Sequence, residues 1–497
     1  MQQVQVSAYR AAGYPAVAIQ TVEEERLATA LLAELPASTP VLGIAAVGGL
    51  RDARTGAVLD RAATFAAAVA RAAATTDAVL LAYDQQHAVR NPGVYRALRD
   101  ALPALRARGA IVILIAPAWV LPPELEHEVP VCDWDLPTRA QLRAALDVCA
   151  QAAGLPALTD DEVAPLLDAA AGLTLAEAEG VFALSLVETG GRFDRSIVER
   201  QKTRLIGQTG YMSVEAPRST AEIGGLGALR EYLAAEVVPS ADDPELMVRG
   251  VLLVGVPGTG KSLAARVTAG LLQWPLVRLD LAACKGSLVG QSEQNIRAAL
   301  RLADAVAPCV LWLDEIEKAV GGYRSSAQTD SGVTLGMVGA LLTWMQERTS
   351  RVLVVATCND YAALPPELTR AGRFDERFFV DLPTSAERRE IAEVHLRRYG
   401  VTPDGHTARI ADLSDGWTGA EIEALVRSAA RRTRRQITTE VLIECARDIR
   451  PISRVRAKEI ESLREWARGA LRPANTPEVT VAAAPTRRLR PTTGGTV

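Results

Sequence analysis

The sequence has few of the residues that mark metal-binding, disulfide-rich and nucleic-acid-binding proteins. It contains only four histidines, which are scattered, and six cysteines without any Cys-x-x-Cys spacing. A metal cluster or a disulfide framework is therefore not indicated, and a reducing compartment such as the cytoplasm is expected. Aromatic residues make up 4% of the chain and the formal net charge is −4, so no overall positive charge points to nucleic acid.

Long hydrophobic segments are also missing. The longest apolar run, residues 110–121, is too short to span a bilayer and is interrupted by Pro117, and the N-terminus shows no basic segment followed by an apolar one. We therefore expect a soluble protein. Its 497 residues, of which 48% are hydrophobic and 23% charged, predict roughly two to four domains with ample core.

The most informative stretch is VLLVGVPGTGKS at residues 251–262. Apolar β-formers lead into a glycine-rich turn closed by Lys261 and Ser262, with Gly255 and Gly260 at the spacing of a Walker A loop. Glycines let backbone N–H groups surround phosphate oxygens, the lysine reaches the β- and γ-phosphates, and the serine holds Mg²⁺. The stretch predicts a P-loop that binds ATP and Mg²⁺. The alternative is a glycine-rich turn with a solvated lysine.

Two later strands end in residues that suit hydrolysis of the bound nucleotide. Residues 309–313 are apolar and precede Asp314 and Glu315, which would hold Mg²⁺ and polarise the attacking water, respectively. The strand expected at residues 352–357 delivers Asn359 as a polar sensor of the γ-phosphate. An acidic pair at a strand end is common and the asparagine could be a turn former, but their order after a P-loop lysine favours the catalytic interpretation.

Arg370 and Arg373 lie in the segment TRAGRFDE, before the last strand of the sheet. On a doubly wound sheet this loop is far from the P-loop of its own subunit. These arginines therefore make most sense as fingers that reach the nucleotide of a neighbouring subunit, where they would stabilise charge on the transferring phosphoryl group. Ordinary surface arginines are the alternative.

The two halves of the sequence match each other in register. Repeated segments are LPPEL at residues 121–125 and 364–368, DLPT at residues 135–138 and 381–384, and GLTLAEAEGV and GWTGAEIEAL from Gly172 and Gly416. The offsets stay between 230 and 246, with Pro40 aligned to Pro275 and Asp84 to Asp314. This pattern predicts a degenerate copy of one α/β module in the first half, and two unrelated α/β domains are the alternative.

The first copy lacks the groups needed for hydrolysis. At the P-loop position it has Thr21, Val22 and the glutamates Glu23, Glu24 and Glu25, and a carboxylate about 4 Å from a phosphate would cost roughly 4 kcal/mol at an effective dielectric near 20. In the alignment Gln85 matches Glu315, Ala116 matches Asn359, and His127 and Pro130 match Arg370 and Arg373. We expect a pseudo-ATPase module kept for shape, assembly or partner binding.

Residues 222–450 resemble an AAA+ ATPase module of the group that includes the membrane AAA proteases, the segregases and the NSF-like ATPases. The resemblance rests on the Walker A and B residues and on EIGGL at residues 222–226, CND at 358–360, RAGRFDE at 370–376 and WTGAEIE at 417–423. The whole architecture, degenerate first half included, is most similar to the divergent AAA-domain proteins encoded in some algal plastid genomes and in cyanobacteria.

This resemblance implies a doubly wound parallel sheet with an α-helical lid, a homo-oligomeric ring that is usually a hexamer, and a cytoplasmic or, if organellar, plastid stromal location. Ile223 and Gly224 would line the adenine pocket, with Gly419 and Ala420 replacing the sensor-2 arginine found elsewhere in the superfamily. The P-loop contacts to the nucleotide would come from Pro257, Gly258, Thr259, Gly260, Lys261, Ser262 and Leu263.

One departure from the family concerns grip on a substrate. Threading motors of this group usually carry an aromatic residue in the first pore loop just ahead of GxSE, and here the segment is CKGSLVGQSE, with Leu288 at that position. A polar insertion near residues 321–333, absent from the first copy, would be the second pore loop.

The chain order follows from these patterns. In the first half, strands are expected at residues 16–19, 40–47, 78–83 and 110–116, and a helix at residues 59–74. The expected segments are the degenerate module at 1–189, a connector with one helix at 190–217, the large α/β subdomain at 218–383, the helical lid with a C-terminal helix at 384–470, and a disordered tail at 471–497. The arginine-rich run at residues 427–435 is expected to be a solvated helix face.

The sequence favours an oligomeric AAA+ ATPase that uses Mg·ATP to remodel a protein partner. A switch or assembly scaffold controlled by ATP, without threading, is the alternative from another class. A nucleic-acid motor is the third hypothesis, weakened by the lack of aromatics interleaved with the arginines.

Overall fold

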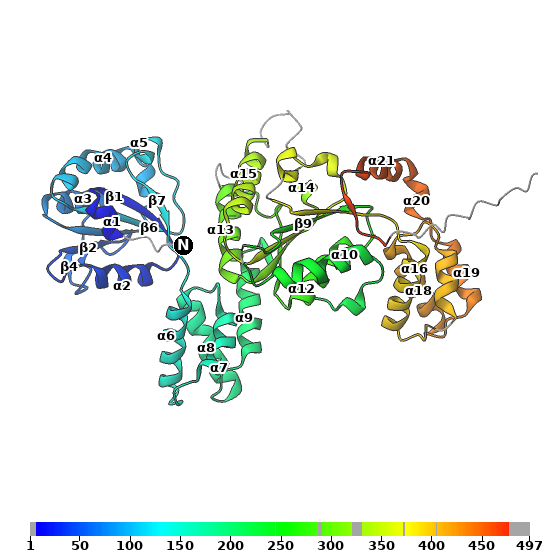
Figure 1. The fold of residues 1–497 in the computed structure, drawn as a ribbon. Helices are drawn as coiled ribbons and strands as arrows, with labels where there is room; N and C mark the ends of the chain where they lie inside the picture. Colours follow the sequence, from blue (N-terminus) through cyan, green and yellow to red (C-terminus); the bar gives the residue numbers. More distant parts are fainter. Residues whose placement is uncertain are drawn as a thin grey trace, which may run out of the picture. The chain divides into compact units, whose positions relative to one another are not determined.

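The computed structural model describes residues 6–476 except 244, 287–290, 321–330, 371–372 and 404. The chain divides into two compact units, each with its own seven-stranded sheet (Figure 1). Leu288, most of the insertion at 321–333 and the tail beyond Thr476 lie outside the described residues.

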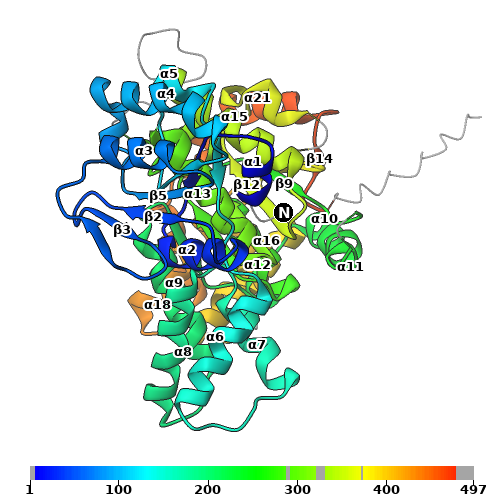
Figure 2. The ribbon, with the colours of Figure 1, turned by 90° about the vertical axis from the view of Figure 1, so that its left-hand side faces the viewer.

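The first sheet has the strand order β4-β3-β2-β5-β6-β1-β7. Its strands are β1 (Ala16–Gln20), β2 (Val41–Ile44), β3 (Leu50–Asp52), β4 (Val58–Asp60), β5 (Val79–Tyr83), β6 (Ile111–Ala116) and β7 (Val131–Asp133). The five strands from β2 to β7 pair in parallel, and β3 and β4 add an antiparallel hairpin outside β2 (Figure 2).

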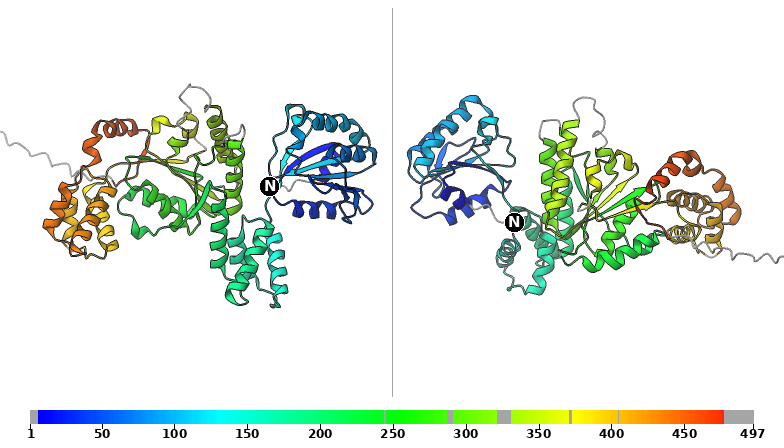
Figure 3. Two further views of the ribbon diagram at one scale, coloured as in Figure 1. Left: turned by 180° about the vertical axis from the view of Figure 1, so that it is seen from behind. Right: turned by 45° about the horizontal axis from the view of Figure 1, so that its top comes forward.

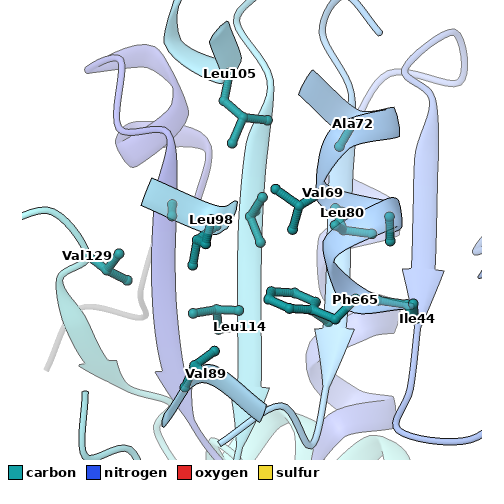
Figure 4. Packing of buried hydrophobic residues seen from close by; sticks show 14 of the residues in the cluster. Ile44, Phe65, Val69, Ala72, Leu80, Val89, Leu98, Leu105, Leu114 and Val129 are labelled. Carbon is teal, nitrogen blue, oxygen red and sulfur yellow. The ribbon is translucent and has the colours of Figure 1, made fainter. Parts of the chain in front are cut away.

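Helices cover both faces of this sheet because successive side chains on each strand point to opposite sides. On one face Leu80 and Leu114 pack against Phe65, Val69 and other residues of α3 (Phe65–Ala74) and α4 (Pro92–Ala107) (Figure 4). The other face packs against α1 (Val6–Ala11) and α2 (Glu24–Glu34). Short turns of helix, η1 (Ala88–Arg90) and α5 (Pro123–Glu126), complete the layer.

The second sheet has the order β14-β13-β9-β12-β11-β10-β8. Its strands are β8 (Met212–Glu215), β9 (Gly250–Gly255), β10 (Leu276–Leu279), β11 (Cys309–Leu313), β12 (Val352–Cys358), β13 (Glu376–Val380) and β14 (Arg472–Pro473). The five central strands of this sheet lie in the order β13-β9-β12-β11-β10. They correspond one to one to the five parallel strands β7-β1-β6-β5-β2 of the first sheet, and corresponding strands follow each other in the same order along the chain. The predicted fold class, a P-loop type sheet preceded by a copy of itself, is confirmed.

The helices that precede and connect the strands of the second sheet follow the same alternation along the chain, although the segments 283–307 and 335–341 belong to the first compact unit. They are η2 (Thr220–Glu222), α10 (Gly227–Tyr232), a π-helical turn η3 (Leu233–Val237), α11 (Val238–Ser240), α12 (Lys261–Leu272), α13 (Gln291–Val306), α14 (Ile316–Val320), α15 (Ser331–Glu347), η5 (Tyr361–Ala363) and η6 (Pro366–Thr369).

A bundle of helices follows each sheet. The first bundle has α6 (Arg139–Ala152), α7 (Asp160–Ala170), α8 (Leu175–Thr189) and α9 (Arg195–Gln208), and the second has α16 (Ser385–Arg398), α17 (His406–Leu413), α18 (Gly419–Thr433) and α19 (Thr439–Arg447) (Figure 3). Thr138 and Thr384 start equivalent helices with capping boxes, and so do Thr174 and Thr418. The chain then adds α20 (Ile452–Val455) and α21 (Ala457–Ala467).

The strand ladders correct the alignment of the acidic residues by one position. Val79 and Val310 are equivalent, since their N–H groups donate to the carbonyls of Pro40 and Pro275, each at 2.9 Å. Five residues further on stand Asp84 and Glu315, both with left-handed backbone (φ 55° and 48°). Asp84 therefore corresponds to Glu315, not to Asp314, and Tyr83 takes the place of Asp314.

Three other expectations differ from the structure. The helix expected at residues 59–74 begins only at Phe65, where the Thr64 side chain caps it, and residues 58–60 extend the sheet instead. The helix of the expected connector, α9, packs against α7 and α8 as part of the first bundle, since Val198 is buried in its core. The tail is ordered at its start, because β14 pairs with β13 and Ala474 is fully buried.

Candidate functional site

A cavity of about 460 Å³ opens in the second unit where β9, β11 and β12 end. The predicted residues that line it are Ile223, Gly224, Pro257, Gly258, Thr259, Gly260, Lys261, Ser262, Leu263, Asp314, Glu315, Asn359, Gly419 and Ala420. Lining residues to which the sequence analysis gave no role in the site are Glu222, Leu226, Thr357, Ile391, Val394, His395 and Glu423, of which Glu222, Leu226 and Glu423 lie within its family motifs. The carboxyl ends of parallel strands and the lid helices thus meet at one site.

The turn after β9 needs glycine at two positions. Gly258 and Gly260 have φ of 82° and 97°, which disfavours other residues. A Cβ on Gly258 would also approach the Cβ of Ala420 to 3.2 Å. The Ala420 N–H donates to the Gly258 carbonyl at 3.1 Å, so the glycine turn and the start of lid helix α18 are in direct contact.

Lys261 begins α12 and is buried, with 6% of its surface exposed. Its Nζ donates to the carbonyls of Gly255 and Val256, both at 2.8 Å, and so folds back over the turn. Burial lowers the pKa of Lys261 to about 8, while the nearby acids Glu317, Glu315 and Asp314 oppose the shift. The buried ammonium group of Lys261, which donates to these two carbonyls, is therefore placed where it can bind an anion.

Side chains from three elements converge beside Lys261. The Ser262 hydroxyl donates to Asp314 Oδ1 at 3.1 Å, and the Thr357 hydroxyl donates to the same oxygen at 2.7 Å. Thr357 Oγ1 in turn accepts from the backbone N–H of Glu315 at 2.9 Å. Thr357 is fully buried within an apolar strand pattern, and only the tertiary structure shows that it fixes the acidic pair.

Asn359 lies within hydrogen-bond distance of the acidic loop. Its Nδ2 donates to Glu315 Oε1 and to Glu317 Oε1, each at 3.1 Å. The second carboxylate oxygen of Glu315 accepts from Lys318, one turn further along α14. The expected sensor and the expected base therefore touch.

The apolar end of the cavity is formed by the segment after η2 and by lid helix α16. A Cβ on Gly224 would lie 2.5 Å from the backbone nitrogen of Ile391, so only glycine allows this approach. His395 lies at this end, and burial lowers its pKa. The arrangement suits a flat ring held between Ile223 and the lid.

Arg370 and Arg373 do not line the cavity. Arg370 is exposed, and Arg373 NH1 donates to the backbone carbonyl of Glu367, six residues earlier. Within its own chain, the described structure thus gives neither arginine a contact to the P-loop.

A glycine turn at the end of a central parallel strand, with lysine, serine and an acidic pair around it, defines a P-loop nucleotide-binding protein. The family comparisons agree with this class. Residues 251–382 match the model of the ATPase family associated with various cellular activities (AAA), and residues 2–134 and 140–209 match the N-terminal and second domains of SpoVK-like AAA ATPases. The chain belongs to the AAA family of ATPases.

Three relatives match between 45% and 75% of the chain. The AAA domain-containing protein ycf46 of Guillardia theta is 33% identical over 75% of this chain and 76% of its own length. The ycf46 protein of Pyropia yezoensis is 31% identical over 75% and 77%. A cell division cycle protein 48 homolog of Archaeoglobus fulgidus is 33% identical over 45% of this chain and 32% of its own length.

The described part of the chain contains no helix with the length and hydropathy that a membrane crossing requires.

The residues present fit Mg·ATP, which would supply the phosphoanhydride bond that is broken. The glycine turn leaves room for phosphates beside Lys261, and Ser262 and Asp314 form a hydroxyl and carboxylate pair of the kind that holds Mg²⁺. The cavity volume is in the range typical of ligand sites.

The affinity for ATP is expected to depend on pH through Lys261. Because the pKa of Lys261 is about 8 and phosphates favour its charged form, the affinity should be constant below pH 8 and fall as the pH rises further, by up to about tenfold per unit. Titrations of a fluorescent ATP analogue between pH 7 and 9.5 check this. A Lys261→Arg chain is the control, because its guanidinium does not titrate there, and an equal pH dependence in both would contradict the assignment.

Proposed function

We propose that this protein is an Mg·ATP-hydrolysing AAA+ ATPase that works as an oligomeric ring and remodels a protein partner. The observation that carries the proposal is the contact of Asn359 with Glu315 in the cavity that also holds Lys261, Ser262 and Asp314. A carboxylate and an amide side by side, next to a phosphate-binding turn, can orient water and accept its proton.

Each residue has one task in this proposal. The P-loop amides and Lys261 bind the phosphates, Ser262 and Asp314 hold Mg²⁺, Glu315 accepts the proton of the attacking water, and Asn359 senses the γ-phosphate. Arg370 and Arg373 would act on the nucleotide of a neighbouring subunit. The proposal therefore includes a ring of subunits, which in this family is usually a hexamer.

The first module is proposed to be a pseudo-ATPase. Glu23, at its P-loop position, is buried in an ion pair of 2.7 Å with Arg26. The same carboxylate accepts the backbone N–H of Leu175, at the start of α8, at 2.6 Å. In the second module the equivalent helix start, at Gly419, lines the cavity. Protein side chains thus take the contacts that a nucleotide would need.

Lys261→Ala should abolish ATP binding by the whole chain. With the second site disabled and no site in the first module, the variant should show no rise in melting temperature with ATP. A single site at 100 times Kd would stabilise the wild type by about 2.7 kcal/mol, a shift that a thermal melt resolves. A remaining ATP-dependent shift in Lys261→Ala would contradict the pseudo-ATPase assignment.

The alternative is a nucleotide-controlled switch or scaffold without threading, and Leu288 at the usual aromatic position is the observation that favours it. If the protein is a motor, Leu288→Ala should retain basal ATP turnover but lose ATP-dependent remodelling of a partner captured on a Glu315→Gln trap. Unchanged remodelling would favour the switch. A nucleic-acid motor is less favoured, and absence of a gel shift at low salt would remove it.

A further inference from the structure

A second glutamate, Glu317, lies behind the expected sensor. Its Oε1 accepts two hydrogen bonds from Asn359, from the backbone N–H and from side-chain Nδ2, both at 3.1 Å. Two bonds from one residue to one oxygen fix both the backbone and the side-chain torsions of Asn359. The direction in which the amide faces the cavity therefore depends on Glu317.

Burying the carboxylate of Glu317 has a free-energy cost that other contacts must compensate. The residue is 8% exposed, its Oε2 meets no hydrogen-bond partner by geometry among the described residues, and its charge lies near the Cys358 thiol and the Lys261 ammonium. Ionisable groups are rarely kept in such positions without compensation. The two hydrogen bonds from Asn359 are the main contacts that compensate the burial of this carboxylate, so Glu317 and Asn359 are coupled to each other.

The backbone shape of the acidic loop brings Glu317 to this place. The left-handed conformation of Glu315 (φ 48°) turns the chain after Asp314, so Glu315 and Glu317, two residues apart, both reach the same Nδ2. Asn359 is thereby held between the expected base and a second carboxylate that lies outside the cavity lining.

The first module supplies an internal comparison. Seven residues after the equivalent valines Val79 and Val310 stand Gln86 and Glu317. Val79 pairs with Ile111 and Val310 with Leu353, so Pro117 corresponds to Asn359, one position beyond the Ala116 of the sequence alignment. The copy without a sensor amide thus has a neutral residue at the position of Glu317, although it keeps an acid, Asp84, at the position of Glu315.

We propose that Glu317 is a positioning residue, which orients Asn359 toward the γ-phosphate and so sets the preference of the site for ATP over ADP. The proposal rests on the proposed ATPase function and adds a residue that acts only through the sensor. Glu317 does not touch the nucleotide in this scheme. Removing its charge should weaken recognition of the γ-phosphate and leave recognition of the β-phosphate unchanged.

The test compares two affinities in one sample. For the full chain, ADP and the slowly hydrolysed analogue ATPγS are titrated into wild type, Glu317→Gln and Asn359→Ala, with Glu444→Gln on the exposed face of α19 as the matched control. Glu317→Gln should keep its ADP affinity within about twofold and lose about tenfold of the ATPγS-to-ADP affinity ratio. The control should behave as wild type. Partial unfolding does not change a ratio measured on one sample.

A double-mutant cycle separates positioning from a structural role. If Glu317 acts through Asn359, Glu317→Gln should have almost no further effect on the affinity ratio in an Asn359→Ala chain. If the effects of the two substitutions on the affinity ratio multiply in the double mutant, the proposal is wrong. So would an equal loss of ADP and ATPγS affinity, which would mean that Glu317 acts through the charge of Lys261 instead. If the wild type binds ATPγS but does not hydrolyse ATP, the proposed function fails while the affinity ratio still tests Glu317.

Discussion

Arg373→Ala should leave ATP binding nearly intact and slow ATP turnover by roughly 10³ to 10⁵ fold, the range measured for arginine fingers. Binding persists because Lys261 and the glycine turn are untouched. Arg373 does not line the cavity of its own chain, and among the described residues it donates to the Glu367 carbonyl, so under the proposed function its effect on turnover is exerted on the nucleotide of a neighbouring subunit. Turnover and nucleotide affinity, measured on the same preparation, check both halves of this expectation.

Mixing variants tests whether the arginine acts between subunits. Arg373→Ala chains mixed with Glu315→Gln chains should recover part of the activity, because an Arg373→Ala subunit keeps a working Glu315 and can receive an arginine from its neighbour. Neither parent alone can form such a site. Arg389→Ala, an exposed arginine of α16, is the matched control and should turn over ATP as wild type. A mixture no more active than its parents, although subunits exchange, would refute the trans assignment.

Glu315→Gln should bind ATP and hydrolyse it about 10² to 10⁴ fold more slowly, the usual contribution of a positioned general base. Glutamine keeps the shape and can still accept from Asn359 Nδ2, but it cannot take the proton of the attacking water. Single-turnover hydrolysis with saturating ATP measures the chemical step directly.

The chain contains its own control for this experiment. Asp84 occupies the position of Glu315 in the first module and has the same left-handed backbone, but the sequence there has Glu23, Glu24 and Glu25 in place of the P-loop. Asp84→Asn should therefore leave turnover unchanged. Wild-type turnover by Glu315→Gln, or a loss of turnover in Asp84→Asn, would move the catalytic role away from Glu315.

Local sequence was enough to predict which residues line the cavity, because each residue of the glycine turn acts through short-range geometry. The turn at residues 255–262 needs glycines for its left-handed backbone, and Lys261 and Ser262 follow it at the start of one helix. Asp314, Glu315 and Asn359 directly follow buried apolar strands, and parallel strands bring their carboxyl ends to one edge. The internal repeat likewise predicted that both halves have one strand order.

Tertiary contacts decided what the sequence pattern could not. In the sequence, Thr357 is an ordinary strand residue and Glu317 an ordinary helix residue. Only the pairing of the strands brings Thr357 into contact with Asp314, and Glu317 into contact with Asn359. The alignment of Asp84 was shifted by one residue because sequence offsets change at every loop, whereas hydrogen-bond ladders fix register. The strands β3, β4, β7, β8 and β14 were missed because each is short, and a strand of two to four residues is specified by the partner it pairs with more than by its own sequence.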